Sequence, residues 1–118
     1  MTSRYNPTSA FYTAAESVGN LAGYDDPGVK LLAYSLYKQT RVGDVTGSRP
    51  LLDPESKMKF DAWTLVKGMT HQEADARYLN CSEHMVQGVP LNPENSALLG
   101  AIKEKLGVNK PYLSSLWR

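Results

Sequence analysis

Apolar side chains recur at helical spacing along most of this chain, and a polar cap residue stands before each run. Thr8 caps the first predicted helix, which Gly19 and Gly23 weaken and are expected to end. A second helix is expected to start at Asp26, which precedes a proline, and to stop at Gly43. The apolar positions of these two helices are Phe11, Ala14, Ala15, Val18, Leu21, Ala22, Val29, Leu32, Ala33 and Leu36.

Two further helices are predicted beyond an irregular stretch over residues 44–52, which can carry the chain across the end of a helical bundle. The third helix starts at the cap–proline–acid signal of residues 53–55 and is expected to stop at Gly68. The fourth starts at a capping box over residues 70–73 and ends near Gly88.

The last thirty residues predict one more helix and a tail. After a linker over residues 89–92, Asn92 caps a fifth helix that Gly107 is expected to end. The tail over residues 111–117 is apolar enough to pack against the rest of the protein. Because no β alternation is sustained and no internal repeat is visible, the sequence predicts an all-α fold.

Composition and charge narrow the class of protein. A chain of 118 residues predicts one domain, and a net charge of +1 argues against broad capture of nucleic acid. Cys81 is the only cysteine, which excludes an intrachain disulfide and a zinc cluster of cysteines. No apolar run is long enough for a membrane helix, and residues 1–7 lack the apolar run of a signal peptide, so the cytosol is the expected location.

One helical face carries candidate binding chemistry. Tyr34, Tyr37 and Lys38 stand at i, i+3 and i+4, a spacing that places two phenol rings and one ammonium group on one side of a helix. Such a face can hold a flat heteroaromatic ring and an anion together. The alternative is an ordinary amphipathic boundary, in which the tyrosines are half-buried and the lysine extends to solvent.

Further segments extend this face into a longer pattern. They are Phe11 with Ala14-Ala15, Tyr34-Ser35-Leu36-Tyr37-Lys38-Gln39, Val42-Gly43-Asp44, Arg49-Pro50, Lys57-Met58-Lys59-Phe60-Asp61-Ala62-Trp63, Lys67-Gly68, Ala74 and Tyr78. In this order and spacing, from about Phe11 to Met85, the chain resembles the acyl-CoA-binding protein family. Each segment alone is unspecific, and the combination carries the resemblance.

The resemblance implies a four-helix bundle of up-down-down-up topology over residues 5–88, with the long connection between the second and third helices crossing over. Residues 89–118 would form a C-terminal extension, a fifth helix and a tail packed on the bundle. The family binds one medium- or long-chain acyl-CoA without catalysis. The resemblance therefore implies a carrier that buffers and transports acyl-CoA esters in the cytosol.

The resemblance also implies roles for five residues at the CoA head group. Lys38 and Lys59 match positions that neutralise the 3′-phosphate, helped by the hydroxyl group of Tyr34. Tyr37 matches a position that packs on adenine, and Tyr78 matches one that contacts the adenosine part. Two ammonium groups and a phenol around one phosphate would give short, charge-assisted hydrogen bonds.

The acyl chain is expected to lie in a groove between helices. The candidate residues for this groove are Phe11, Ala15, Lys30, Leu31 and Phe60. Burial of an acyl chain contributes about 0.8 kcal/mol per methylene, so a dozen buried methylenes would outweigh any single head-group contact. The head group would then orient the ligand, while the groove would set the dependence on chain length.

Four departures from the family pattern bear on specificity. Gly19 stands where many relatives carry a lysine that reaches the phosphates. Lys30 either narrows the groove or pairs with a phosphate, and Phe60 replaces a tryptophan. Ser82 replaces an apolar residue, so the fifth helix is expected to cover the surface around it. The alternatives are that the extension forms a lid over the groove or docks a partner.

Two other function classes stay open. An acyl-CoA enzyme would need a nucleophile or base, and only Cys81 and His84, three residues apart on one helix, are candidates. A helical interaction domain could keep the fold without the ligand. His71 lies in a capping box and is expected to be exposed. The sequence holds no metal-ligand constellation, so we expect no cofactor, with acyl-CoA esters, acyl-CoA-using enzymes and membrane surfaces as partners of a monomer.

Overall fold

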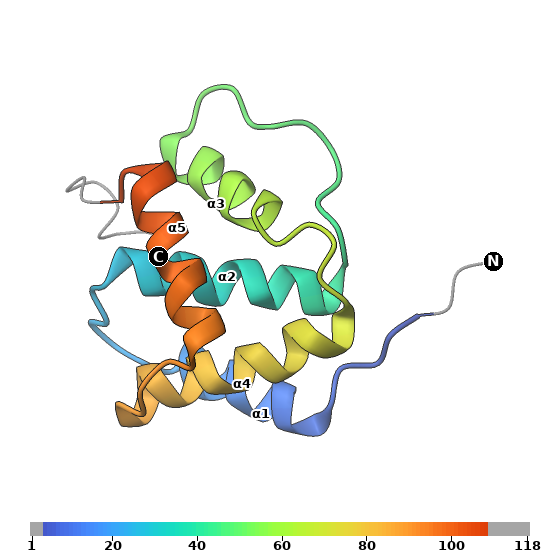
Figure 1. Cartoon of the computed structure of the whole chain (residues 1–118), viewed down its shortest axis with the longest axis vertical. Coiled ribbons are helices and arrows are strands. Elements are labelled where there is room, and N and C mark those ends of the chain that lie inside the picture. The colour runs from blue at the N-terminus through green and yellow to red at the C-terminus, as the bar shows by residue number, and fades with distance from the viewer. Residues whose placement is uncertain (1–3, 109–118) are drawn as a thin grey trace.

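The computed structural model describes residues 4–108, and within them the chain forms five helices and no strand (Figure 1). The helices are α1 (Ser9–Gly19), α2 (Pro27–Arg41), α3 (Pro54–Thr64), α4 (His71–Gln87) and α5 (Pro93–Leu106). The predicted all-α class is thus confirmed, with the four-helix bundle formed by α1 to α4 and one additional helix. The tail over residues 111–117, which we expected to pack, lies outside the described residues.

The helix starts lie where the cap residues predict them. In every helix the side chain of the cap accepts a hydrogen bond from the backbone N–H three residues later, which satisfies one of the donors left open in the first turn. These caps are Thr8, Asp26, Asp53, Thr70 and Asn92. Each contact is local in sequence, so the helix starts need no tertiary structure to explain them.

The helix ends follow the glycine signals less closely. α4 and α5 end at Gly88 and Gly107, which take left-handed conformations with φ of 76° and 62°. α3, by contrast, ends at Thr64, before the predicted stop at Gly68. The reason is that residues 65–69 continue as tight turns, in which backbone N–H groups bond to carbonyls three residues back.

Helix α2 is the centre of the protein. It packs against α3, α4 and α5, and Figure 1 shows it between α3 on one side and α1 and α4 on the other. Its residues Leu31, Leu32 and Leu36 are fully buried, together with Phe11 of α1 and Ile102 of α5. A helix with neighbours on several sides has to be apolar around much of its circumference, as this one is.

The turn after α2 ties that helix to α3. One carboxylate oxygen of Asp44 accepts hydrogen bonds from the Gln39 side-chain amide at 2.9 Å and from the backbone N–H of Gly68 at 2.7 Å. The indole N–H of Trp63 donates to the Gly43 carbonyl at 2.8 Å, and Trp63 is buried. The Val42-Gly43-Asp44 segment therefore has a structural role in this protein.

His71 is not exposed as predicted; it is half-buried at the start of α4. Its ring stacks on Tyr5, with centroids 5.4 Å apart, and its Nδ1 lies 2.8 Å from the Thr40 carbonyl oxygen. The carboxylate of buried Asp75 accepts hydrogen bonds from the Tyr5 hydroxyl and from both the backbone and side chain of Thr8. The segment before α1 is the partner that a reading of the capping box alone misses.

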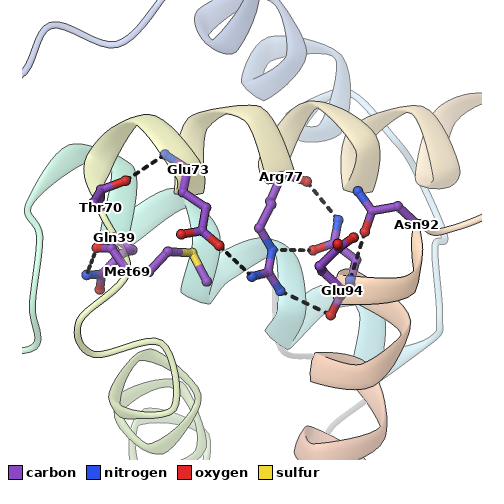
Figure 2. A network of polar contacts seen from close by, with 8 residues as sticks. Gln39, Met69, Thr70, Glu73, Arg77, Asn92 and Glu94 are labelled. Atoms are coloured by element: carbon purple, nitrogen blue, oxygen red, sulfur yellow. Dashed lines mark hydrogen bonds and ion pairs between the residues drawn. The ribbon is translucent and has the colours of Figure 1, made fainter.

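A polar network joins the start of α5 to α4 (Figure 2). The guanidinium group of Arg77 donates to the Asn95 side chain at 3.1 Å, to the Glu94 carbonyl at 3.1 Å and to the Glu73 carboxylate at 3.2 Å. Asn95 is fully buried, and its amide donates back to the Arg77 carbonyl at 2.9 Å and to Asn80 at 3.1 Å. These bonds set the point at which α5 leaves α4.

The prediction that the fifth helix covers the surface around Ser82 is wrong. From its start beside α4, α5 runs across α2 and α3, where its apolar stripe packs on the core. Ser82 instead borders a shallow depression between α1 and α4, together with Thr13. The helices approach closely at Gly28, where an added Cβ would lie 3.0 Å from the Lys103 side chain and 3.1 Å from Leu99.

Candidate functional site

A cavity of about 750 Å³ lies between α1, the α1–α2 loop, α2 and α4. Its wall is mostly apolar, with Val18 from α1, Leu21 from the loop and Met85 from α4. The size falls within the range of pockets that hold small molecules and cofactors. None of the described residues of α5 lines this cavity, so the helix itself does not act as the lid considered from the sequence.

Three aromatic rings meet at one wall of the cavity. Phe11 stacks on Tyr37 with ring centroids 5.5 Å apart, and lies 4.9 Å from the Tyr78 ring. Tyr37 and Tyr78 line the cavity and lie 6.1 Å apart, whereas Phe11 is fully buried behind them. Phe11 therefore supports the two tyrosines from the core, because fixed ring contacts restrict how far each phenol can move.

Helix α3 adds a positive charge to the tyrosine face of α2. The ammonium nitrogen of Lys59 lies 5.4 Å from the centre of the Tyr34 ring, a cation–π distance. Lys38 lies over Trp63 instead, with 4.8 Å between its nitrogen and the ring centre. The structure thus brings Lys59 and Tyr34 together, while Lys38 lies toward α3 and is not among the residues that line the cavity.

The phenols of this site are neutral hydrogen-bond donors at physiological pH. Burial raises the pKa of Tyr34 above its ordinary value. Burial also raises the pKa of Tyr78, with smaller contributions from the neighbouring Cys81 and Tyr37. A neutral phenol can donate to an anion beside it, which a phenolate could not do.

The five acyl-groove candidates divide into two groups. Ala15 and Lys30 line the cavity, and Lys30 is buried, with 6% of its surface exposed. Phe11 and Leu31 are fully buried behind the wall. Phe60 is half-buried on α3 and is not among the lining residues.

The sequence pattern missed Arg41, Tyr24 and Asp25. Arg41 donates a hydrogen bond to the Tyr37 hydroxyl at 2.9 Å, and its i+4 spacing from that residue could have indicated the contact. Tyr24 and Asp25 line the cavity from the α1–α2 loop. No periodicity places a loop residue, so no sequence signal pointed to them.

Gly19, the position at which a cation was expected to be missing, lies at the cavity. An added Cβ would meet no atom within 4 Å. The end of α1 therefore has open space for a side chain, and the glycine is not required there by packing.

The candidate Cys81–His84 pair has no geometry for catalysis. Cys81 is fully buried, and burial raises the pKa of its thiol to about 12. The Nδ1 atom of His84 lies 2.8 Å from the Val89 carbonyl oxygen, at the end of α4. A thiol without access to solvent or to a base is not an activated nucleophile.

Two searches over residues 4–108 limit the chemistry further. No group of three histidine, cysteine or carboxylate side chains in this range could hold a metal ion. Within the same range, the helices are too short or too polar to cross a bilayer.

Comparisons with known proteins agree with the architecture of the site. The family model described as "Acyl CoA binding protein" matches residues 8–81. A protein of the genus Hypsibius, whose name assigns it to the acyl-CoA-binding proteins, is 37% identical over 78 residues, covering 65% of this chain and 88% of that protein. The rice acyl-CoA-binding domain-containing protein 3 is 40% identical over 70 residues, which are 58% of this chain and 45% of that protein.

A solved structure shares the fold. The crystal structure of acyl-CoA-binding protein 2 of Oryza sativa superposes with a TM-score of 0.65 and 33% sequence identity, over 70% of this chain and 93% of that one. The matched family region spans α1 to α4 up to Cys81 and contains Tyr34, Tyr37 and Tyr78. This chain belongs to the acyl-CoA-binding protein family.

Proposed function

We propose that this protein binds medium- and long-chain fatty acyl-CoA esters without transforming them. The observation that carries the proposal is an apolar cavity walled by Tyr34, Tyr37 and Tyr78, with Lys59 beside Tyr34. An acyl-CoA combines a flat base, a phosphate and a hydrocarbon chain. The aromatic, cationic and apolar parts of this site match those three groups.

The head group would lie against the polar end of the site. Lys59 and Lys38 would neutralise the 3′-phosphate, and the neutral Tyr34 phenol would donate a hydrogen bond to it. Tyr37 would pack on the adenine and Tyr78 on the adenosine, with Phe11 holding both rings from behind. Stacking of a base on an aromatic ring contributes about 1–3 kcal/mol in nucleic-acid complexes.

The acyl chain would lie along the apolar wall made by α1, α2 and α4. Ala15, Val18, Ala33 and Met85 present small or flexible side chains to the cavity, which leaves room for a chain. At about 0.8 kcal/mol per buried methylene, this part of the ligand would dominate the affinity. The affinity should therefore rise with chain length until the cavity is full.

In the cell, such a protein would buffer the free concentration of acyl-CoA esters and transport them. We propose that it acts as a monomer in the cytosol and delivers its ligand transiently to acyl-CoA-using enzymes and membrane surfaces. No cofactor is needed for this role. The inaccessible thiol of Cys81 supports binding rather than thioester hydrolysis, because no other nucleophile was indicated by the sequence.

Titration calorimetry with acyl-CoA esters of increasing length and with free CoA tests the proposal. We expect affinity to rise with chain length and to be much weaker for free CoA. A protein that binds none of these ligands would be a helical interaction domain instead. Ester hydrolysis that is present in the wild type and lost in Cys81→Ala would indicate an enzyme.

A further inference from the structure

Lys30 places a cation in the wall of an otherwise apolar cavity. It belongs to the second turn of α2 and is 6% exposed, and its neighbours in the wall include Val18, Leu21 and Ala33. A lysine with so little exposure is uncommon, because removing an ammonium group from water is unfavourable unless polar atoms surround it. This side chain therefore matters for whatever fills the cavity.

Lys30 lies toward one end of the tyrosine face. Lys30, Tyr34 and Tyr37 stand at i, i+4 and i+7 of α2, so all three point to the same side of the helix. At 1.5 Å per residue, Lys30 lies about 10 Å along the helix axis from Tyr37. Tyr37 belongs to the aromatic cluster with Phe11 and Tyr78, so Lys30 is remote from the part of the site that would hold the base.

The polar atoms near this end of the cavity come from the α1–α2 loop. Tyr24 and Asp25 line the same cavity, and Asp25 is exposed, whereas Lys30 is buried. Lys30 and Asp25 are the two lining residues with formal charges among the described part of the chain. A hydrocarbon chain lying against Lys30 would exclude water and provide no acceptor, while an oxygen atom there would form a charge-assisted hydrogen bond.

We infer that the groove selects acyl-CoA esters whose acyl chain carries an oxygen acceptor, a hydroxyl or a carboxylate group, and that Lys30 determines this specificity. The inference rests on the proposed acyl-CoA binding and names the ligand class within it. The hydroxyl and carboxylate share one chemistry at Lys30, because both accept a hydrogen bond from its ammonium group. Near Asp25, a hydroxyl could also donate.

The test compares decanoyl-CoA with its omega-hydroxy and omega-carboxy analogues, using calorimetry on the full chain. We expect at least one oxygen-bearing ester to bind about tenfold more tightly than decanoyl-CoA, the scale of a hydrogen bond to a charged group. Lys30→Met should abolish or reverse this preference and leave the affinity for free CoA unchanged. Lys67→Met, which removes an exposed lysine, is the matched control and should change none of these affinities.

Three results would count against the inference. If wild-type protein binds decanoyl-CoA as tightly as both analogues, the inference is overturned while the proposed function stands, and this comparison needs no variant to fold. A loss of free CoA binding in Lys30→Met equal to the loss for the oxygen-bearing esters would place Lys30 at the head group. Absence of binding for every ester would overturn the proposed function itself.

Discussion

The ammonium nitrogen of Lys59 lies 5.4 Å from the centre of the Tyr34 ring, which joins α3 to α2 beside the cavity. The two residues are 25 positions apart in the chain, with the long α2–α3 connection between them. Their contact places a fixed positive charge next to a neutral phenol. That pair can receive a phosphate without rearrangement of either helix.

Lys59→Ala should therefore weaken acyl-CoA binding by about 1.5–3 kcal/mol, the usual contribution of a hydrogen bond to a charged group. The loss should be much smaller for an ester of 3′-dephospho-CoA, because that ligand lacks the anion. Calorimetry on both esters measures the difference, with Lys57→Ala on the same helix as the control. Equal losses for the two esters would show that Lys59 does not contact the 3′-phosphate.

Gly19→Lys should tighten acyl-CoA binding by about 0.2–1 kcal/mol, as expected for a solvent-exposed charge pair. The position borders the cavity, and an added Cβ meets no atom within 4 Å, so the side chain fits without strain. The gain should shrink as salt is added, because exposed charges are screened. Gly19→Gln serves as the neutral control; an equal gain in that variant would exclude a charge effect.

Asp44 should make stability depend on pH in the acidic range. The N–H of Gly68, and then the Gln39 amide, lower the pKa of this carboxyl below its ordinary value of about 3.9. A depressed pKa in the folded state contributes stability that is present above the unfolded pKa and lost as pH falls through the folded pKa. Asp44→Asn keeps an acceptor oxygen but cannot ionise.

The difference in urea midpoint between wild type and Asp44→Asn isolates this effect, because the other carboxyl groups are common to both proteins. We expect the wild type to be the more stable at neutral pH and the difference to shrink below about pH 4. A difference that stays constant from pH 7 to pH 2 would contradict the assignment.

Ile102→Ala should destabilise the whole protein by about 2–5 kcal/mol, the range for truncation of a large buried aliphatic side chain. Ile102 is fully buried, and α5 packs on α2 and α3, so the helix shares the core of the bundle. Urea unfolding followed by circular dichroism should show one transition at a lower midpoint. Val86→Ala, at an exposed position of α4, is the control. A separate early transition for α5 would show that the helix unfolds independently.

Cys81 should be inert in the folded protein. It is fully buried, and its pKa of about 12 leaves almost no thiolate at neutral pH. Ellman's reagent at pH 7 should therefore react with Cys81 only when urea unfolds the chain. Rapid reaction in native buffer would mean that the thiol is accessible and would reopen the enzyme hypothesis.

Much of the fold was predictable because its signals are local. Each cap, such as Thr8 or Asn92, bonds to an N–H three residues away, and apolar spacing marks the buried stripe of each helix. The pattern of Tyr34, Tyr37 and Lys38 likewise indicated the family, and the first two of these residues line the cavity. Local spacing did not show that Lys38 lies over an indole ring.

The sequence by itself thus determined the helices, their starts and the residue types at the candidate site. Only the tertiary structure decided which of two adjacent residues, Lys30 or Leu31, borders the cavity, since neighbours on a helix point about 100° apart and α2 has partners on several sides. It also decided that α5 covers α2 and α3 rather than the surface at Ser82. Both outcomes depend on contacts between segments far apart in the chain, which no local pattern encodes.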